Sequence, residues 1–149
     1  MDIAAMANSK TAAAPHSAAP LPARGVTRLT HNPAGPAGRL TIRVDLGSQG
    51  ALGPGKVRLM ELIAETGSIS AAGRAMEMSY RRAWLLIDSL NRAFRTPVVA
   101  TQHGGSRGGG AVLTPLGQDL VARYRRLERN AHKAVADDLD AFAEALAAD

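Results

Sequence analysis

The sequence of 149 residues contains no cysteine. That absence excludes disulfides, thiolate zinc sites and cysteine nucleophiles, and it fits a reducing compartment such as the cytoplasm. The start at Met1 lacks the basic segment and the long apolar segment of a secretory signal. No run approaches the ~20 apolar residues that a membrane-spanning helix needs. We therefore expect a cytoplasmic protein without membrane association.

Aromatic residues are also scarce, at 3% of the chain, although 46% of residues are hydrophobic. Alanine supplies much of that hydrophobic fraction, so we expect a lean, mostly aliphatic core. The length allows one domain plus a tail. It does not allow a DNA-binding domain together with a ligand-binding domain of ordinary size.

Positive charge is present in excess and is unevenly distributed. The formal net charge is +5 and the sequence pI is about 10.4. Residues 56–107 hold eight basic and four acidic residues, whereas residues 114–149 hold five basic and seven acidic ones. The central segment therefore favours an anionic partner such as nucleic acid.

Three segments differ in composition. Residues 1–38 are rich in alanine, proline, glycine and serine, which predicts a disordered leader. Residues 39–46 alternate apolar and polar side chains, the pattern of a half-buried strand. We place one folded domain at residues 39–114 and a C-terminal linker or dimerisation helix at residues 115–149.

Within residues 39–114 the pattern predicts a winged helix-turn-helix, mainly α with a small β component. Helices are expected at residues 56–65, from Ser68 to about residue 76, and from Ser79 to about Phe94. Ser68 and Ser79 are good N-caps, and Gly67 stands where a C-cap glycine belongs. Two β-prone runs, 98–102 and 110–114, enclose a glycine-rich hairpin tip.

The second helix of such a motif lies in the major groove of DNA, and its N-terminal residues meet the base edges. Arginine can bond guanine bidentately, and a serine hydroxyl near helix N-terminal amides suits phosphate. A wing tip can insert arginine into the minor groove. The candidate DNA-binding residues are Ser79, Tyr80, Arg81, Arg82, Ser70, Arg107 and Ser106.

Trp84 is the only tryptophan and stands one helical turn after Tyr80. Its position beside the apolar stripe favours a packing role in or near the core. The alternative is an apolar contact to DNA at the edge of the groove.

Thr114 and Pro115 predict the start of a final helix, as N-cap and first helical residue. Apolar residues then recur every three or four positions over about thirty residues. Such a stripe is too long to pack only on its own small domain, which favours a helix–helix contact in a homodimer. Folding back on the domain is the alternative. The candidate dimerisation residues are Leu120, Tyr124, Leu127, Val135, Leu139 and Phe142.

The sequence gives no sign of catalysis, metal or cofactor binding. The four histidines show no metal-like spacing. The glycine-rich segment 104–110 lacks the Gly-Lys-Ser/Thr ending and the following helix of a phosphate-binding loop. We expect a binding protein with no cofactor and no enzymatic activity.

With these residues in view, the chain resembles the N-terminal winged helix-turn-helix domain of ModE-type molybdate-responsive transcriptional regulators. The resemblance rests on three motifs: Gly67–Ser70, the Ser-Tyr-Arg-Arg-Ala-Trp run at residues 79–84, and the glycine-rich wing at residues 104–114, followed by Gly117 and Leu120. It covers about residues 40–124. The related LysR-type winged helix shares the Gly-Ser start and the general layout.

The resemblance implies a homodimeric transcriptional regulator that binds a palindromic operator in double-stranded DNA. It further implies molybdenum-related genes as candidate targets. Full-length members carry C-terminal molybdate-binding domains, which we do not find before Asp149. We therefore assign no molybdate ligands and do not expect direct molybdate binding. The alternative is a small interaction or oxyanion-binding module on a winged-helix scaffold, without sequence-specific DNA binding.

Overall fold

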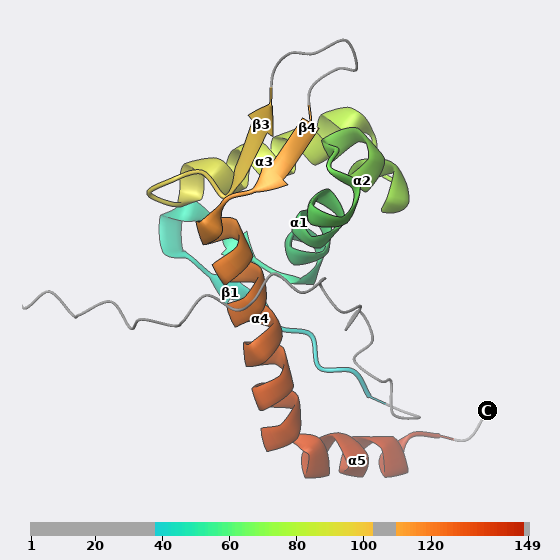
Figure 1. The fold of residues 1–149 in the computed structure, drawn as a ribbon. Helices are drawn as coiled ribbons and strands as arrows, with labels where there is room; N and C mark the ends of the chain where they lie inside the picture. Colours follow the sequence, from blue (N-terminus) through green and yellow to red (C-terminus); the bar gives the residue numbers. More distant parts are fainter. Residues whose placement is uncertain (1–37, 103–109, 148–149) are drawn as a thin grey trace, which may run out of the picture.

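A computed structural model describes residues 38–102 and 110–147 (Figure 1). The predicted leader therefore lies outside the described residues, apart from Gly38. The elements, in chain order, are β1 (Val44–Asp45), a short 3-10 turn (Gly47–Gln49), β2 (Ala51–Leu52), α1 (Pro54–Thr66), α2 (Ile69–Ala75), α3 (Tyr80–Ala93), β3 (Val99–Gln102), β4 (Gly110–Leu113), α4 (Pro115–Ala134) and α5 (Ala136–Ala145). This order confirms a mainly helical winged helix-turn-helix.

The ends of the first three helices follow from local signals. α1 begins two residues earlier than expected, because Pro54 occupies the first turn, where no backbone donor is needed. Gly67 ends α1 in the left-handed conformation, with φ of 69°. Ser68 caps α2 by accepting from Ala71 N at 3.1 Å, and Ser79 caps α3 by accepting from Arg82 N at 3.1 Å. The predicted caps are thus confirmed.

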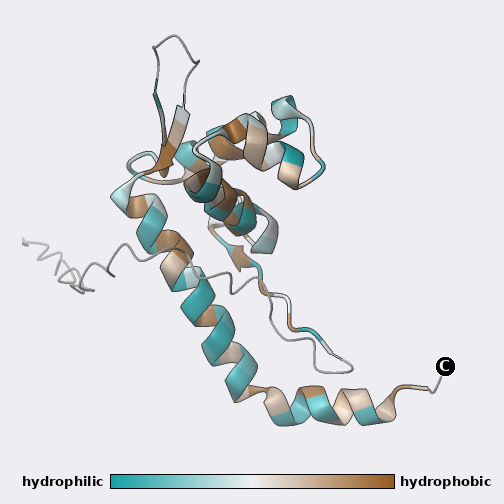
Figure 2. Ribbon diagram, turned by 45° about the vertical axis from the view of Figure 1, so that its right-hand side comes forward, coloured by the Kyte–Doolittle hydropathy of each residue, from teal (hydrophilic) through white to brown (hydrophobic). Residues whose placement is uncertain are grey.

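The core is centred on α1, which packs against α2, α3, α4 and β4. Its members are small or aliphatic except for one tyrosine, as the scarcity of aromatic residues predicted. The largest side chains that are fully buried are Leu59, Met60, Ile63, Ile87, Leu90, Val57, Val98 and Val99. Figure 2 shows hydrophobic stretches of the ribbon where the helices and the hairpin meet.

The segment predicted as a strand over residues 39–46 keeps its alternating burial, but only Val44 and Asp45 pair, with Leu52 and Ala51 of β2. The preceding residues run beside α4 instead of beside another strand (Figure 1). There the hydroxyl of Tyr124 donates to the carbonyl of Ile42 at 2.7 Å. The predicted strand is therefore too long, because a helix side chain takes up part of its backbone hydrogen bonding.

The prediction of one uninterrupted final helix is wrong. α4 ends at Ala134, Val135 has φ of −113° and ψ of 14°, and α5 turns sharply aside (Figure 1). Charges favour a break here: His132 and Lys133 lie in the last turn of α4, and Asp137 and Asp138 lie in the first turn of α5. Each pair suits the dipole of its own helix end.

Candidate nucleic-acid interface

The turn between α2 and α3 brings the two helices unusually close. The carbonyl of Gly73 accepts hydrogen bonds from Met76 N at 3.1 Å and from Met78 N at 3.0 Å. A Cβ atom at Gly73 would stand only 3.0 Å from Cβ of Ala83. Glu77 takes a positive φ of 57° to complete the turn. The tight turn fixes α3 against α2 and leaves the opposite side of α3 toward solvent.

The N-terminal half of α3 presents cations to solvent. Arg81 and Arg82 are both exposed, and neither forms an ion pair with another described residue. The first turn of α3 contains no acidic residue. Ser79 holds one backbone amide of this turn and is itself exposed. The structure therefore brings Ser79, Tyr80, Arg81 and Arg82 together at one exposed helix start.

Trp84 is partly buried, which both interpretations of the sequence allow. It is 41% exposed, beside Tyr80 at 56% and Leu85 at 55%. The inward positions of α3 are Ala83, Ile87 and Leu90. At 100° per residue, Trp84 lies about a quarter turn from the centre of that inward face, so its ring lies at the edge of the core.

The wing is held to the helices by hydrogen bonds at its base. β3 and β4 pair antiparallel, with Val99 opposite Leu113 and Gln102 opposite Gly110. Ala111 N donates to the carbonyl of Gly67 at 2.8 Å, which ties β4 to the turn between α1 and α2. The hairpin therefore has a fixed direction relative to α2.

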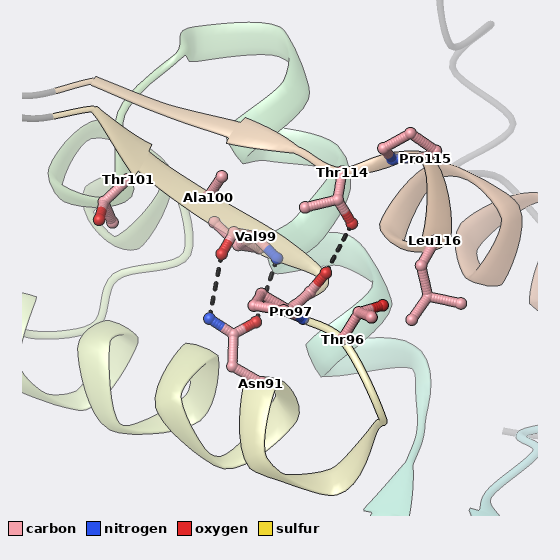
Figure 3. A pocket seen from close by; sticks show the side chains of 9 residues that line it. All are labelled: Asn91, Thr96, Pro97, Val99, Ala100, Thr101, Thr114, Pro115 and Leu116. Carbon is pink, nitrogen blue, oxygen red and sulfur yellow. Dashed lines mark hydrogen bonds between the residues drawn. The ribbon is translucent and has the colours of Figure 1, made fainter.

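Asn91 ties β3 to α3 in the same region. Its Oδ1 accepts from Val98 N at 2.9 Å and from Val99 N at 3.1 Å, and its Nδ2 donates to the carbonyl of Val99 at 3.0 Å. Figure 3 shows this amide reaching from α3 to the start of the wing, beside a shallow surface hollow. One side chain thus couples the exposed helix to the hairpin.

Other predicted DNA contacts are placed less favourably or not at all. Ser70, the second residue of α2, is half-buried. Ser106 and Arg107 lie in the hairpin tip, which is outside the described residues.

A buried ion pair joins α4 to α1. Glu61 is 3% exposed, and its carboxylate accepts from Nε of Arg125 at 2.7 Å and from Nη2 at 2.9 Å. Nη1 of Arg125 also donates to Glu128 at 2.6 Å. The hydrogen bonds to Glu61 raise the pKa of Arg125 above its already high usual value, although burial opposes them. The guanidinium is therefore charged at every accessible pH.

The start of α4 is fixed just as tightly. Thr114 accepts from Gly117 N at 3.1 Å and donates its hydroxyl to the carbonyl of Pro97 at 2.7 Å (Figure 3). A Cβ atom at Gly117 would lie 2.1 Å from the carbonyl oxygen of Val98, so only glycine fits. The direction in which α4 leaves the domain is therefore set by the domain itself.

The predicted dimerisation stripe divides into two parts. Tyr124 is 2% exposed and belongs to the core of its own chain, and Leu120 packs partly against that core. Val135 and Leu139 are half-buried, whereas Leu127 and Phe142 are exposed. Folding back, the alternative, thus holds for the first turns of α4. Figure 2 shows hydrophilic residues dominating the rest of α4.

The sequence did not reveal the structural roles of five residues that position the helices and the wing: Gly73, Asn91, Gly117, Glu61 and Arg125. The amide of Asn91 looked like one polar residue on an amphipathic helix, with no signal of its distant partner. Glu61 stands within the run Met60–Ile63 of α1, but the sequence does not show that it is buried, and only a buried carboxylate needs a cation as its partner.

No group of three or more histidine, aspartate or glutamate side chains is placed to hold a metal ion within residues 38–102 and 110–147. Over the same residues, no helix is long and apolar enough to cross a membrane.

A model of the bacterial regulatory helix-turn-helix proteins of the lysR family matches residues 55–118. The chain is 43% identical over 100 residues to a molybdenum-pterin-binding protein, MopB, of Rhodobacter capsulatus, covering 66% of this chain and 37% of that protein. It is 40% identical over 90 residues to the molybdenum transport protein ModE of Azotobacter vinelandii, covering 60% and 33%. With a DNA-binding transcriptional dual regulator, ModE of Escherichia coli K12, it shares 35% identity over 88 residues, covering 57% and 34%.

The solved structure of a LysR family transcriptional regulator superposes with a TM-score of 0.43 at 19% identity, covering 56% of this chain and 27% of that one. The chain spans about a third of the length of the curated relatives named above. The match at residues 55–118 begins in α1 and ends in α4, so it includes the whole helix-turn-helix and the hairpin. Residues 55–118 therefore match the lysR-family helix-turn-helix, and the chain is similar over 60–66% of its length to the ModE and MopB proteins named first above.

Proposed function

We propose that this chain is a sequence-specific DNA-binding transcriptional regulator, with α3 as the helix that enters the major groove. The observation that carries the proposal is the exposed start of α3. There Arg81 and Arg82 stand beside a serine cap, with no described ion-pair partner and no acid in the first turn. Of the candidate contacts, Ser79, Tyr80, Arg81 and Arg82 have the most direct support.

The wing supplies the second contact in this proposal. Asn91 and the Gly67–Ala111 hydrogen bond fix its base beside α3. A hairpin so placed can reach the sugar-phosphate backbone or the minor groove next to the helix. Ser106 and Arg107 remain candidates for that contact, and Ser70 remains a candidate for phosphate binding at the start of α2.

We further propose that the chain acts as a homodimer in the cytoplasm, with no catalytic role. The exposed Leu127 and Phe142, together with Val135 and Leu139, are the remaining candidates for the dimer contact. A twofold dimer would bind two half-sites related by symmetry. The ModE and Mop names of the relatives make molybdenum-related genes the first targets to examine.

Selection from a random pool of duplex DNA tests the proposal. We expect an enriched site with two related halves, bound far more tightly than a scrambled duplex at the same salt concentration. Binding that falls steeply with salt but is equal for both duplexes would instead favour the interaction-module alternative. The same assay with and without molybdate shows whether the anion affects binding, and calorimetry with molybdate shows whether this chain binds it directly.

A further inference from the structure

Among the described residues, large apolar side chains are exposed at seven positions, and three of them lie in the first half of α3. These three, Tyr80, Trp84 and Leu85, are here called the α3 apolar patch. The other four are spread over β4, α4, α5 and the residue after α5: Val112, Leu127, Phe142 and Leu146. Clustered exposed apolar surface marks a site of contact.

The patch covers two sides of α3. Leu85 lies two residues before the buried Ile87, so it points about 160° away from it, toward solvent. Trp84 lies seven residues before Asn91, about 20° short of two full turns, so the two share one flank. Asn91 bonds the wing strand β3 from that flank. Trp84 therefore lies toward the wing, about 10 Å nearer the start of α3.

The charges around the patch identify its partner. Residues 80–87 contain Arg81 and Arg82 and no acidic residue. The first acid of α3, Asp88, is ion-paired with Arg92. A surface that combines cations with apolar groups matches the major groove, where phosphates line the rim and the C5-methyl of thymine is the apolar group. A solvated helix face would carry polar residues in place of Trp84 and Leu85.

We propose that the α3 apolar patch reads thymine, by packing against C5-methyl groups in the major groove beside the bases contacted by the arginines. Trp84 provides the contact nearest the wing, and Leu85 provides the one on the outer face. This inference rests on the proposed DNA-binding function and adds a base preference to it.

The test replaces each thymine of the selected site, one at a time, by deoxyuridine, which pairs identically but lacks the methyl group. For the unmodified protein we expect about fourfold weaker binding at one or more positions, the effect of losing one buried methyl contact. In Trp84→Ala or Leu85→Ala the penalty at the contacted position disappears, so thymine and uracil bind equally there. Trp84→Phe retains part of it.

Leu146→Ala is the matched control, because it removes an exposed apolar side chain just after α5, far along the chain from α3. Its pattern of uracil penalties should equal that of the unmodified protein. If the Trp84 variant does not fold, Tyr80→Ala takes its place in the uracil assay, because Tyr80 belongs to the same patch and is the first residue of α3. Trp84 is also the only tryptophan, so its fluorescence reports the contact directly and should change when the selected duplex is added.

Three results would overturn the inference. One is a selected site at which no thymine-to-uracil change weakens binding. Another is a set of patch variants that keep every penalty of the unmodified protein. The third is a patch variant that alters self-association in solution but not the uracil pattern, since the patch would then bind protein. A protein that selects no DNA site at all would instead contradict the proposed function.

Discussion

The side-chain amide of Asn91 bonds both backbone polar groups of Val99, the first residue of β3, at 3.1 Å and 3.0 Å. These bonds fix the position of the wing relative to α3, although each of the two packs mainly on other elements. If α3 and the wing contact DNA together, their spacing must match that of neighbouring grooves. Asn91 is the residue that sets it.

Asn91→Ala tests this relationship. The change removes three hydrogen bonds and leaves the amides of Val98 and Val99 without an acceptor. We expect a loss of about 2–3 kcal/mol in the free energy of unfolding, measured by denaturant titration, and weaker binding of the selected DNA. Ser89→Ala, an exposed change on the same helix, is the control and should cost little. Equal stability of the two variants would refute the role of Asn91.

Glu61→Gln tests the buried ion pair between α1 and α4. The change removes one of the two carboxylates that pair with Arg125, and its guanidinium stays largely buried. We therefore expect a loss of about 3 kcal/mol in the free energy of unfolding. Glu65→Gln removes a carboxylate from the same helix, but that side chain is 30% exposed and bonds only Arg58. Its cost should stay below about 1 kcal/mol. Similar losses in both variants would show that burial of the pair does not matter.

Two glycine-to-alanine changes near helix starts should have opposite signs. At Gly117 the new Cβ would stand 2.1 Å from the carbonyl oxygen of Val98, so the start of α4 must shift. We expect a lower melting temperature. At Gly55 in α1 nothing lies within 4 Å of the new Cβ. Alanine there should stabilise the protein by up to about 1 kcal/mol, through its higher helix propensity. A stabilising Gly117→Ala would show that α4 is not tightly seated.

The raised pKa of Tyr124 leads us to expect that the protein loses stability at alkaline pH. Burial, and then the charge of Glu128, raise the pKa of Tyr124 above its usual value near 10.0. The folded chain therefore holds this proton more tightly than the unfolded chain does. The resulting stability is complete below pH 10 and is lost as pH rises through the raised pKa. Tyr124→Phe should show a smaller fall in the free energy of unfolding above pH 10; an identical fall would contradict the assignment.

Features set by neighbouring residues were predictable from the sequence. Gly67, Ser68, Ser79 and Thr114 mark helix ends through bonds to residues three or four positions away. The winged helix-turn-helix follows from their order.

Contacts between distant segments were not predictable in the same way. The bond from Tyr124 to Ile42 shortens the expected strand, and it turns an expected dimer contact into a core residue. The exposure of Trp84 was not predictable, because periodicity places it at the border of the buried face, and neighbouring elements decide how far a border residue is covered. The break at Val135 had a local signal in the flanking charges, but the apolar stripe concealed it.

The most direct test of the central claim, that α3 reads DNA sequence, is the affinity of Arg81→Ala for the selected site and for its single-base variants at constant salt. We expect the variant to bind the selected site about 1–3 kcal/mol more weakly and to lose discrimination at one base pair, while discrimination elsewhere is kept. A variant that retains the affinity and base preferences of the unmodified protein, also when Arg82 is changed to alanine with it, would show that α3 is not the reading helix.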